Sequence, residues 1–436
     1  MADSQHEPGD LGLFLLRVAA ALNTSGLTVD DVQRRVERIA RAYGTTSIRV
    51  SAFPTFVMIA LSDGEPTTLE VTPMGADSHR LDQIVALERL CARAERGEVD
   101  IPRALAQLAE IEDQPPRFGT MVSIIGYAVL SAGLCLVLRP SRHEVTAAAV
   151  LGLLVGALQP LVRPRPPLRV LLPVLAAFLV AAVSGFATRA GLIDTGIRPI
   201  VASLIVFLPG ATLTAAVLEL GSGQLVSGAS RLVSGIMSLA LLAFGILAGT
   251  EVAGVSTTQA LSGSSHLLGP WAPWLGVGLF ALGVALTNSA PKGAMTGLLI
   301  VLYAAWAAQL SGNALWGSHM GAFTGAVVLV LAASLLARLP TMVPRQASFL
   351  PGFWLLVPGA LGLIGLTSWA TSDGTSPSAD LRLTAGSIFA VAVGVLVGTQ
   401  VWDWVVSGGT AVSRYSKEPT RIGRFVATFK RSGRAP

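Results

Sequence analysis

Ten apolar segments follow one another from Phe118 onward, and each is long enough to cross a bilayer. Each holds about 17 to 24 residues, whereas a transmembrane helix needs about 20. The segments are 118–138, 145–162, 168–187, 199–218, 232–254, 271–287, 293–310, 315–336, 349–370 and 383–406. The pattern therefore predicts a polytopic α-helical membrane protein with about ten transmembrane helices.

The first 117 residues have a different pattern, typical of a small soluble α+β domain. Thr28 is the expected N-cap of one helix there, because Asp30 and Asp31 fall in the first turn that follows it. Pro115-Pro116 marks the end of the domain. Hydrophobic periodicity predicts helices at 11–22, 29–43, 81–96 and 101–111, and β-branched and aromatic residues predict three short strands between 47 and 72.

Composition agrees with this division. Apolar residues make up 52% of the chain and charged residues 13%, against about 25% charged in an average soluble protein. Residues 1–117 hold 18 of the 26 acidic but only 12 of the 31 basic residues, so the membrane part is strongly basic. No basic cluster is interleaved with aromatic residues, and we therefore interpret the pI of 9.7 as membrane topology and expect no nucleic-acid partner.

The basic residues also predict the orientation. Fourteen Lys and Arg residues fall in the loops and tail that would lie inside if the first span enters from the cytoplasm, and five fall outside. This excess favours both termini in the cytoplasm. The expected location is the cytoplasmic (inner) membrane. The expected parts are a cytoplasmic domain at 1–117, five spans at 118–254, an external linker at 255–270, five spans at 271–406 and a basic cytoplasmic tail at 407–436.

Cofactor and metal chemistry has no motif in the chain. Cys91 lies in a predicted soluble helix and Cys135 in the first span, so a disulfide between them is implausible. The five histidines show no ligand spacing, and we predict neither a metal site nor a cofactor. P-loop, G-x-S-x-G and dinucleotide-binding motifs are missing from the sequence, which argues against ATP hydrolysis and against an enzyme.

The stretch from Ile197 to Leu232 is the candidate site. Pro209-Gly210 falls midway along a span, where proline removes a backbone donor, so the helix should kink or unwind. Exposed helix ends there, with the hydroxyls of Thr212 and Thr214, would suit the carboxylate and ammonium of a zwitterion. The alternative is a kink that only helps helices to pack.

Glu219 and Arg231 flank a Gly/Ser segment that the sequence suggests is flexible. Glu219 falls near the cytoplasmic end of its span, where a carboxylate at the edge of low dielectric can carry a proton or act at an inner gate. It can equally cap the membrane boundary or pair with Arg231. Arg231 in turn can bind a carboxylate, anchor the interface or neutralise Glu219.

A weak internal repeat adds to this picture. Pro358-Gly359 stands 149 residues after Pro209-Gly210, and each pair lies in the penultimate span of a group of five. Because five is odd, the second group would be inverted relative to the first. Two inverted five-helix repeats with matching broken helices are the plan of many secondary transporters.

The run FLPGATLTAAVLELGSGQLVSGASRLVSGI, the second-half run LVPGALGLIGL and the N-terminal LRVAAALNTSGLTVDDVQRRVERIARAYG resemble the threonine/serine exporter family. The resemblance implies ten spans in two halves, a cytoplasmic N-terminal domain, and export of small hydroxylated amino acids driven by the proton gradient. Carried over by position, it marks Pro209, Gly210, Glu219, Gly228, Arg231, Pro358 and Gly359 without giving each a chemical role.

The resemblance and the sequence pattern together favour a proton-coupled exporter of threonine- or serine-like amino acids. It would work by alternating access about a site at the two Pro-Gly breaks. Its expected partners are the amino acid, protons and the lipid bilayer, and a homo-oligomer stays open. Two other classes are weighed against it. One is a membrane-embedded hydrolase that uses the N-terminal domain, and the other is a structural or sensory membrane protein.

Overall fold

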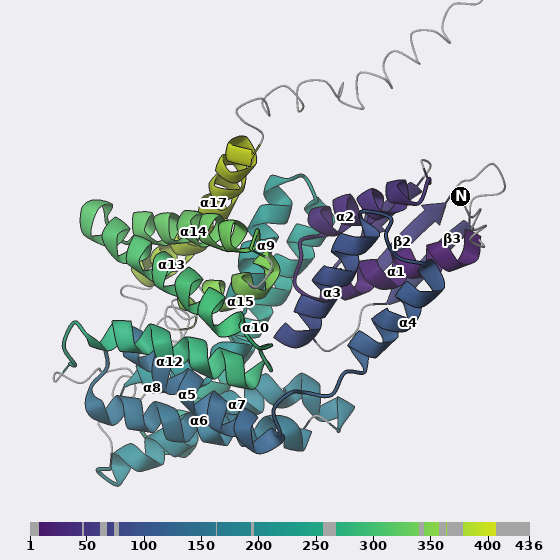
Figure 1. Ribbon diagram of the computed structural model, residues 1–436. Helices are drawn as coiled ribbons and strands as arrows, with labels where there is room; N and C mark the ends of the chain where they lie inside the picture. Colours follow the sequence, from purple (N-terminus) through teal and green to yellow (C-terminus); the bar gives the residue numbers. More distant parts are fainter. Residues whose placement is uncertain are drawn as a thin grey trace, which may run out of the picture.

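A computed structural model describes residues 8–45, 48–61, 68–73, 78–162, 164–192, 196–255, 267–339, 344–356, 363 and 378–406. Helices dominate it, and the N-terminal elements lie to one side of the long apolar helices (Figure 1). Pro358, Gly359, most of the expected external linker and the basic tail lie outside the described residues.

The N-terminal elements form a unit with its own core, which we call the N-terminal unit (residues 8–112). Its sheet is an antiparallel meander in the order β1-β2-β3, with Val50 paired to Ile59 and Met58 to Val71. The elements are α1 (Pro8–Thr24), α2 (Val29–Ala42), β1 (Ile48–Ala52), β2 (Phe56–Leu61), β3 (Thr68–Pro73), α3 (Leu81–Ala94) and α4 (Ile101–Glu112).

Alternation along β2 sets the core of this unit. Val57 and Ile59 are buried while their strand neighbours are half-buried, because side chains alternate between the two faces of a strand. Helix α1 packs on β2 and β3 and buries Phe14, Leu15 and Leu22. The expected N-cap of α2 is confirmed, since the Thr28 hydroxyl accepts a hydrogen bond from the Asp31 amide.

The apolar helices follow from residue 120. Seven helices within the described residues are long and apolar enough to span a membrane, or eight when a pair bent by 65° is taken as one span. The elements are α5 (Thr120–Val137), α6 (Arg142–Val162), α7 (Pro166–Arg189), the bent pair α8 (Ile197–Ser203) with η1 (Ile205–Phe207) and α9 (Gly210–Gly221), α10 (Leu225–Val252), α12 (Ala272–Thr287), α13 (Ala294–Trp316), α14 (Ser318–Leu336), α15 (Arg345–Leu356) and α17 (Ser378–Val406).

These helices make the chain a multi-pass α-helical membrane protein, as predicted, but the count of ten is not established. Helix α12 has only 16 residues, and α15 has 12 residues within the described part of the chain. At about 1.5 Å per residue, neither length covers the roughly 30 Å of a hydrocarbon core.

Glycines let α5 and α12 cross at very short range. A methyl group added at Gly133 would lie 2.8 Å from the carbonyl carbon of Leu279, and one added at Gly276 would lie 2.8 Å from Cβ of Leu136. Later positions on α5 thus meet earlier positions on α12, so the two helices run antiparallel. Small residues permit such backbone approach between membrane helices.

The N-terminal unit contacts one end of this helical bundle. The Leu81 amide donates to the Asn288 carbonyl at 3.0 Å, and Arg117, in the segment between the unit and α5, donates to the Ala290 carbonyl at 2.7 Å. Helix α3 also contacts α15. The C-terminal end of α12 therefore faces the N-terminal unit, and so does the start of α5.

Candidate functional site

The span that carries Pro209 is broken, as the sequence predicts. Helix α8 ends at Ser203, a turn of 3₁₀ helix follows, and α9 begins at Gly210. Proline has no N–H to donate to the Ile205 carbonyl, which accepts instead from the Leu208 amide at 3.1 Å. Leu208 is extended, at φ −70° and ψ 125°, as the residue before proline prefers. The break therefore starts several residues before the proline.

Tyr127 of α5 holds the end of α8 in place. Its hydroxyl donates to the Ser203 carbonyl at 3.0 Å, and both residues are buried. The carbonyls in the last turn of a helix have no partner within the helix, so an outside donor stabilises the break. Sequence reasoning missed Tyr127, because 76 residues separate it from Ser203.

The two threonines after the break differ in their surroundings. Thr214 is buried, and its hydroxyl donates to the Gly210 carbonyl at 2.9 Å, within α9. Thr212 is half-buried near the start of the same helix. Pro358 and Gly359, the expected counterparts of Pro209 and Gly210, lie outside the described residues, so the second break is a prediction only.

Glu219 and Arg231 form an ion pair between α9 and α10. Arg231 Nε lies 3.1 Å from Glu219 Oε1, and the Glu219 side chain is completely buried while that of Arg231 is 15% exposed. The contact lacks the direction of a hydrogen bond, and Glu219 Oε2 has no hydrogen-bond partner among the described residues. Of the alternatives left open by the sequence, pairing with Arg231 is thus confirmed.

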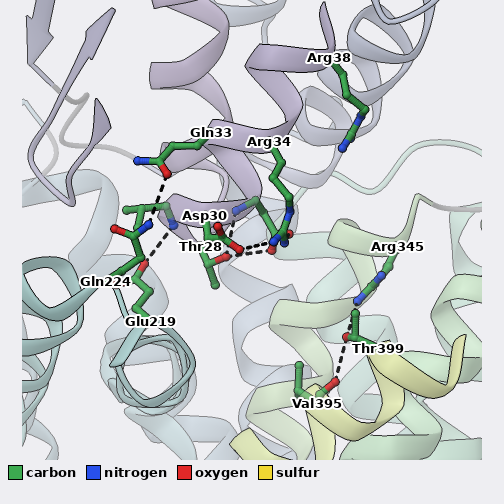
Figure 2. Close-up of polar contacts among 12 residues, drawn as sticks. Thr28, Asp30, Gln33, Arg34, Arg38, Glu219, Gln224, Arg345, Val395 and Thr399 are labelled. Carbon is green, nitrogen blue, oxygen red and sulfur yellow. Dashed lines mark hydrogen bonds and ion pairs between the residues drawn. The ribbon is translucent and has the colours of Figure 1, made fainter. Parts of the chain in front are cut away.

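The N-terminal unit supplies further contacts to this pair. The Val29 amide, the first in α2, donates to Glu219 Oε1 at 3.1 Å, and Arg231 donates to Asn23 Oδ1 at 3.0 Å. Gln224 lies in the turn between α9 and α10, and its Nε2 donates to Gln33 Oε1 at 3.3 Å (Figure 2). The positive end of the α2 dipole favours a carboxylate at this place. None of these contacts was predicted, because about 190 residues separate Glu219 from Val29.

The expectation of a flexible Gly/Ser segment after Glu219 is wrong. Helix α10 begins at Leu225, so only three residues connect it to α9. Gly228, within α10, serves close packing between the two helices: a methyl group added there would lie 2.9 Å from the Ala216 carbonyl oxygen. Gly228 thus has a structural explanation, namely the close α9–α10 crossing.

A second buried carboxylate of the membrane helices was overlooked in the sequence. Glu144 in the first turn of α6 is 1% exposed, and Arg198 of α8 lies 3.3 Å from its Oε2. The Ser141 amide donates to Oε2 at 2.6 Å, and Ser141 Oγ accepts from the Glu144 amide at 3.3 Å. The Ser-x-x-Glu spacing of a capping box is the signal that would have drawn attention to Glu144.

Comparison with known proteins supports the sequence resemblance. Residues 13–253 match the model of the family ThrE, described as "Putative threonine/serine exporter". No curated protein and no solved structure matches the chain. The matched residues contain most of the N-terminal unit, the broken span and both carboxylate–arginine pairs. Since the match covers more than half of the chain, the protein belongs to the ThrE family.

Proposed function

We propose that the protein is a secondary active exporter of small hydroxylated amino acids, threonine and serine above all, that moves them out of the cytoplasm in exchange for protons. The observation that carries the proposal is the broken span within the family match, with a buried carboxylate–arginine pair at one end. Broken helices with polar groups at membrane depth are the usual basis of a transport site.

Pro209 and Gly210 provide the substrate site in this proposal. The first amides of α9 have no acceptor within the helix, and the dipole favours the carboxylate of an amino acid there. Half-buried Thr212 lies in the same turn and offers a hydroxyl to the substrate. Buried Thr214, whose hydroxyl is used within α9, would help to hold this turn in shape. Pro358 and Gly359 would provide the matching half of the site.

The inverted repeat remains part of the proposal, and two features of the bundle support it. Helices α5 and α12, which open the two proposed groups of five, run antiparallel across their glycines. In the first group α7 packs on α10, and in the second α14 packs on α17. The third and fifth helices of the two groups thus make corresponding contacts.

Glu219 is the proposed proton carrier, and Arg231 its partner at an inner gate. A buried carboxylate beside an arginine can exchange a proton when the pair separates, because burial then disfavours the charged form. The free Oε2 atom gives an incoming proton a site that no described donor occupies. The N-terminal unit would lie on the cytoplasmic side of the inner membrane, with both termini inside.

Transport by purified protein in liposomes tests the proposal. Labelled threonine or serine should accumulate when a pH gradient is imposed. Glu219→Gln should remove the dependence of flux on the gradient while expression stays normal. Glu251→Gln is the matched control, because Glu251 is exposed near the end of α10.

Unchanged pH-dependent flux in Glu219→Gln would refute the role in proton coupling. Lack of accumulation by the parent protein, together with product formation from a hydrolysable substrate, would replace the exporter by an enzyme.

A further inference from the structure

The two carboxylate–arginine pairs lie at opposite ends of the broken span. Arg198 is the second residue of α8, where the span begins, and Glu219 is close to the end of α9, where it finishes. Helix α5 begins near the N-terminal unit and runs for 18 residues, about 27 Å, to the end that carries Glu144. The Glu144–Arg198 pair is therefore remote from the N-terminal unit, and the Glu219–Arg231 pair is in contact with it.

The two pairs are built alike. Each carboxylate is at most 1% exposed, and each arginine is partly exposed, by 27% at Arg198 and 15% at Arg231. Each carboxylate also accepts a backbone N–H, from Ser141 three residues earlier in one pair and from Val29 of α2 in the other. In each pair one charged group belongs to the broken span and the other to an adjacent helix.

The capping box explains only part of the surroundings of Glu144. It accounts for the hydrogen bonds with Ser141, but not for Arg198, which comes from a different helix. Gly196 precedes α8, and a side chain there would collide with Glu144 Oε1. Gly196 also lines a small pocket between α7, α8 and α10, with the hydroxyl residues Ser184, Thr188 and Thr250. Any shift of α8 would therefore separate the pair and reshape this pocket.

We propose that Glu144 and Arg198 form a second gate, which closes the end of the broken span remote from the N-terminal unit and opens only when the Glu219–Arg231 pair is closed. Separation of a buried ion pair is unfavourable, so each pair stabilises one closed end. The alternation of the two gates rests on the proposed transport function. The proposal that the Glu144–Arg198 pair closes its end of the span does not depend on transport, and it rests only on the contacts described above.

Cys135 is a natural reporter for this gate. Its thiol lies 3.5 Å from the Glu144 carbonyl oxygen, and it is completely buried. The full chain with Cys91→Ser would be placed in lipid nanodiscs and treated with a polyethylene-glycol maleimide, which adds to Cys135 only when that end opens. Nanodiscs expose both faces, so the orientation of the protein does not matter, and no substrate is needed.

Glu144→Gln should speed labelling of Cys135 by roughly tenfold, because glutamine keeps the capping box and removes the charge. Gly196→Ala should also speed it while keeping both charges. Arg142→Gln is the matched control and should label like the parent, since Arg142 is an exposed neighbour in α6. Glu219→Gln should slow labelling of Cys135 severalfold. Weakening the Glu219–Arg231 gate favours the state in which the Glu144–Arg198 gate is closed.

Two results would overturn the proposal. One is equal labelling of Cys135 in the parent, Glu144→Gln and Gly196→Ala. The other is labelling that Glu219→Gln leaves unchanged, since a purely structural pair would be indifferent to the opposite end. Failure of amino-acid transport in liposomes would instead remove the proposed function and leave the response of Cys135 to Glu144→Gln and Gly196→Ala as measured.

Discussion

Replacing Val29 by proline should loosen the N-terminal unit from the helical bundle without disturbing α2. Val29 is the first residue of α2, where the amide has no acceptor within the helix and proline is well tolerated. Thr28 is already extended, at φ −68° and ψ 152°, as a residue before proline must be. The substitution therefore deletes one hydrogen bond, from the Val29 amide to Glu219 at 3.1 Å.

The free energy lost with the Val29–Glu219 hydrogen bond follows from the charge on Glu219. A hydrogen bond to a charged group contributes about 1.5–3 kcal/mol. Arg231 remains as a partner for the carboxylate, so we expect the lower end, about 1.5 kcal/mol, or roughly a tenfold rise in the undocked population. Val29→Ala is the control, because it also removes the buried valine side chain but keeps the amide.

Hydrogen exchange of the Leu81 amide is a suitable measurement. This amide donates to Asn288 across the same interface, at 3.0 Å, and is freed only when the N-terminal unit moves away. Its exchange in the full chain should be about tenfold faster in Val29→Pro than in Val29→Ala, by the free-energy difference above. Equal rates in the two variants would show that the Val29–Glu219 hydrogen bond does not hold the unit in place.

Two further predictions concern packing and pH. Gly133→Ala should lower the free energy of unfolding by about 1–3 kcal/mol, and with it the thermal midpoint, because the added methyl group meets the backbone of α12. Gly119 has open space around it, so Gly119→Ala should leave the thermal midpoint unchanged. Burial, and then the charge of Arg80, lower the pKa of His79. The folded state thus binds fewer protons than the unfolded state, and stability should fall as pH drops below about 6.5. Protection factors of α1 amides should follow this trend, and His79→Gln should abolish it; a pH dependence that persists in His79→Gln would assign it to another group.

Local signals in the sequence predicted the elements that local chemistry determines. Thr28 with the acidic residues after it fixed the start of α2, and Pro209 was sufficient to predict the broken span. The pairing of Glu219 with Arg231 could be weighed because the two residues are only 12 positions apart in the sequence. The role and extent of the second break stay predictions, since Pro358 lies outside the described residues.

Contacts between distant segments could not be read from the sequence. Glu144 falls between two predicted spans, and its partner Arg198 is 54 positions away, so the sequence did not link the two residues. The Gly/Ser run after Glu219 looked like a loop for a different reason. Small residues are turn formers in water, but in a membrane bundle they mark helix crossings such as that at Gly228. A run of glycine and serine therefore predicts a turn in a soluble domain but a close helix crossing in a membrane bundle.

The hydrogen bond from Val29 to Glu219 has a consequence for the evolution of this family. The donor is a main-chain amide, which every residue except proline possesses, so the side chain at position 29 can vary while the contact persists. Covariation between positions would then link Glu219 to Arg231 but not to α2. A sequence-based map of couplings would thus understate how firmly the N-terminal unit is joined to the membrane helices.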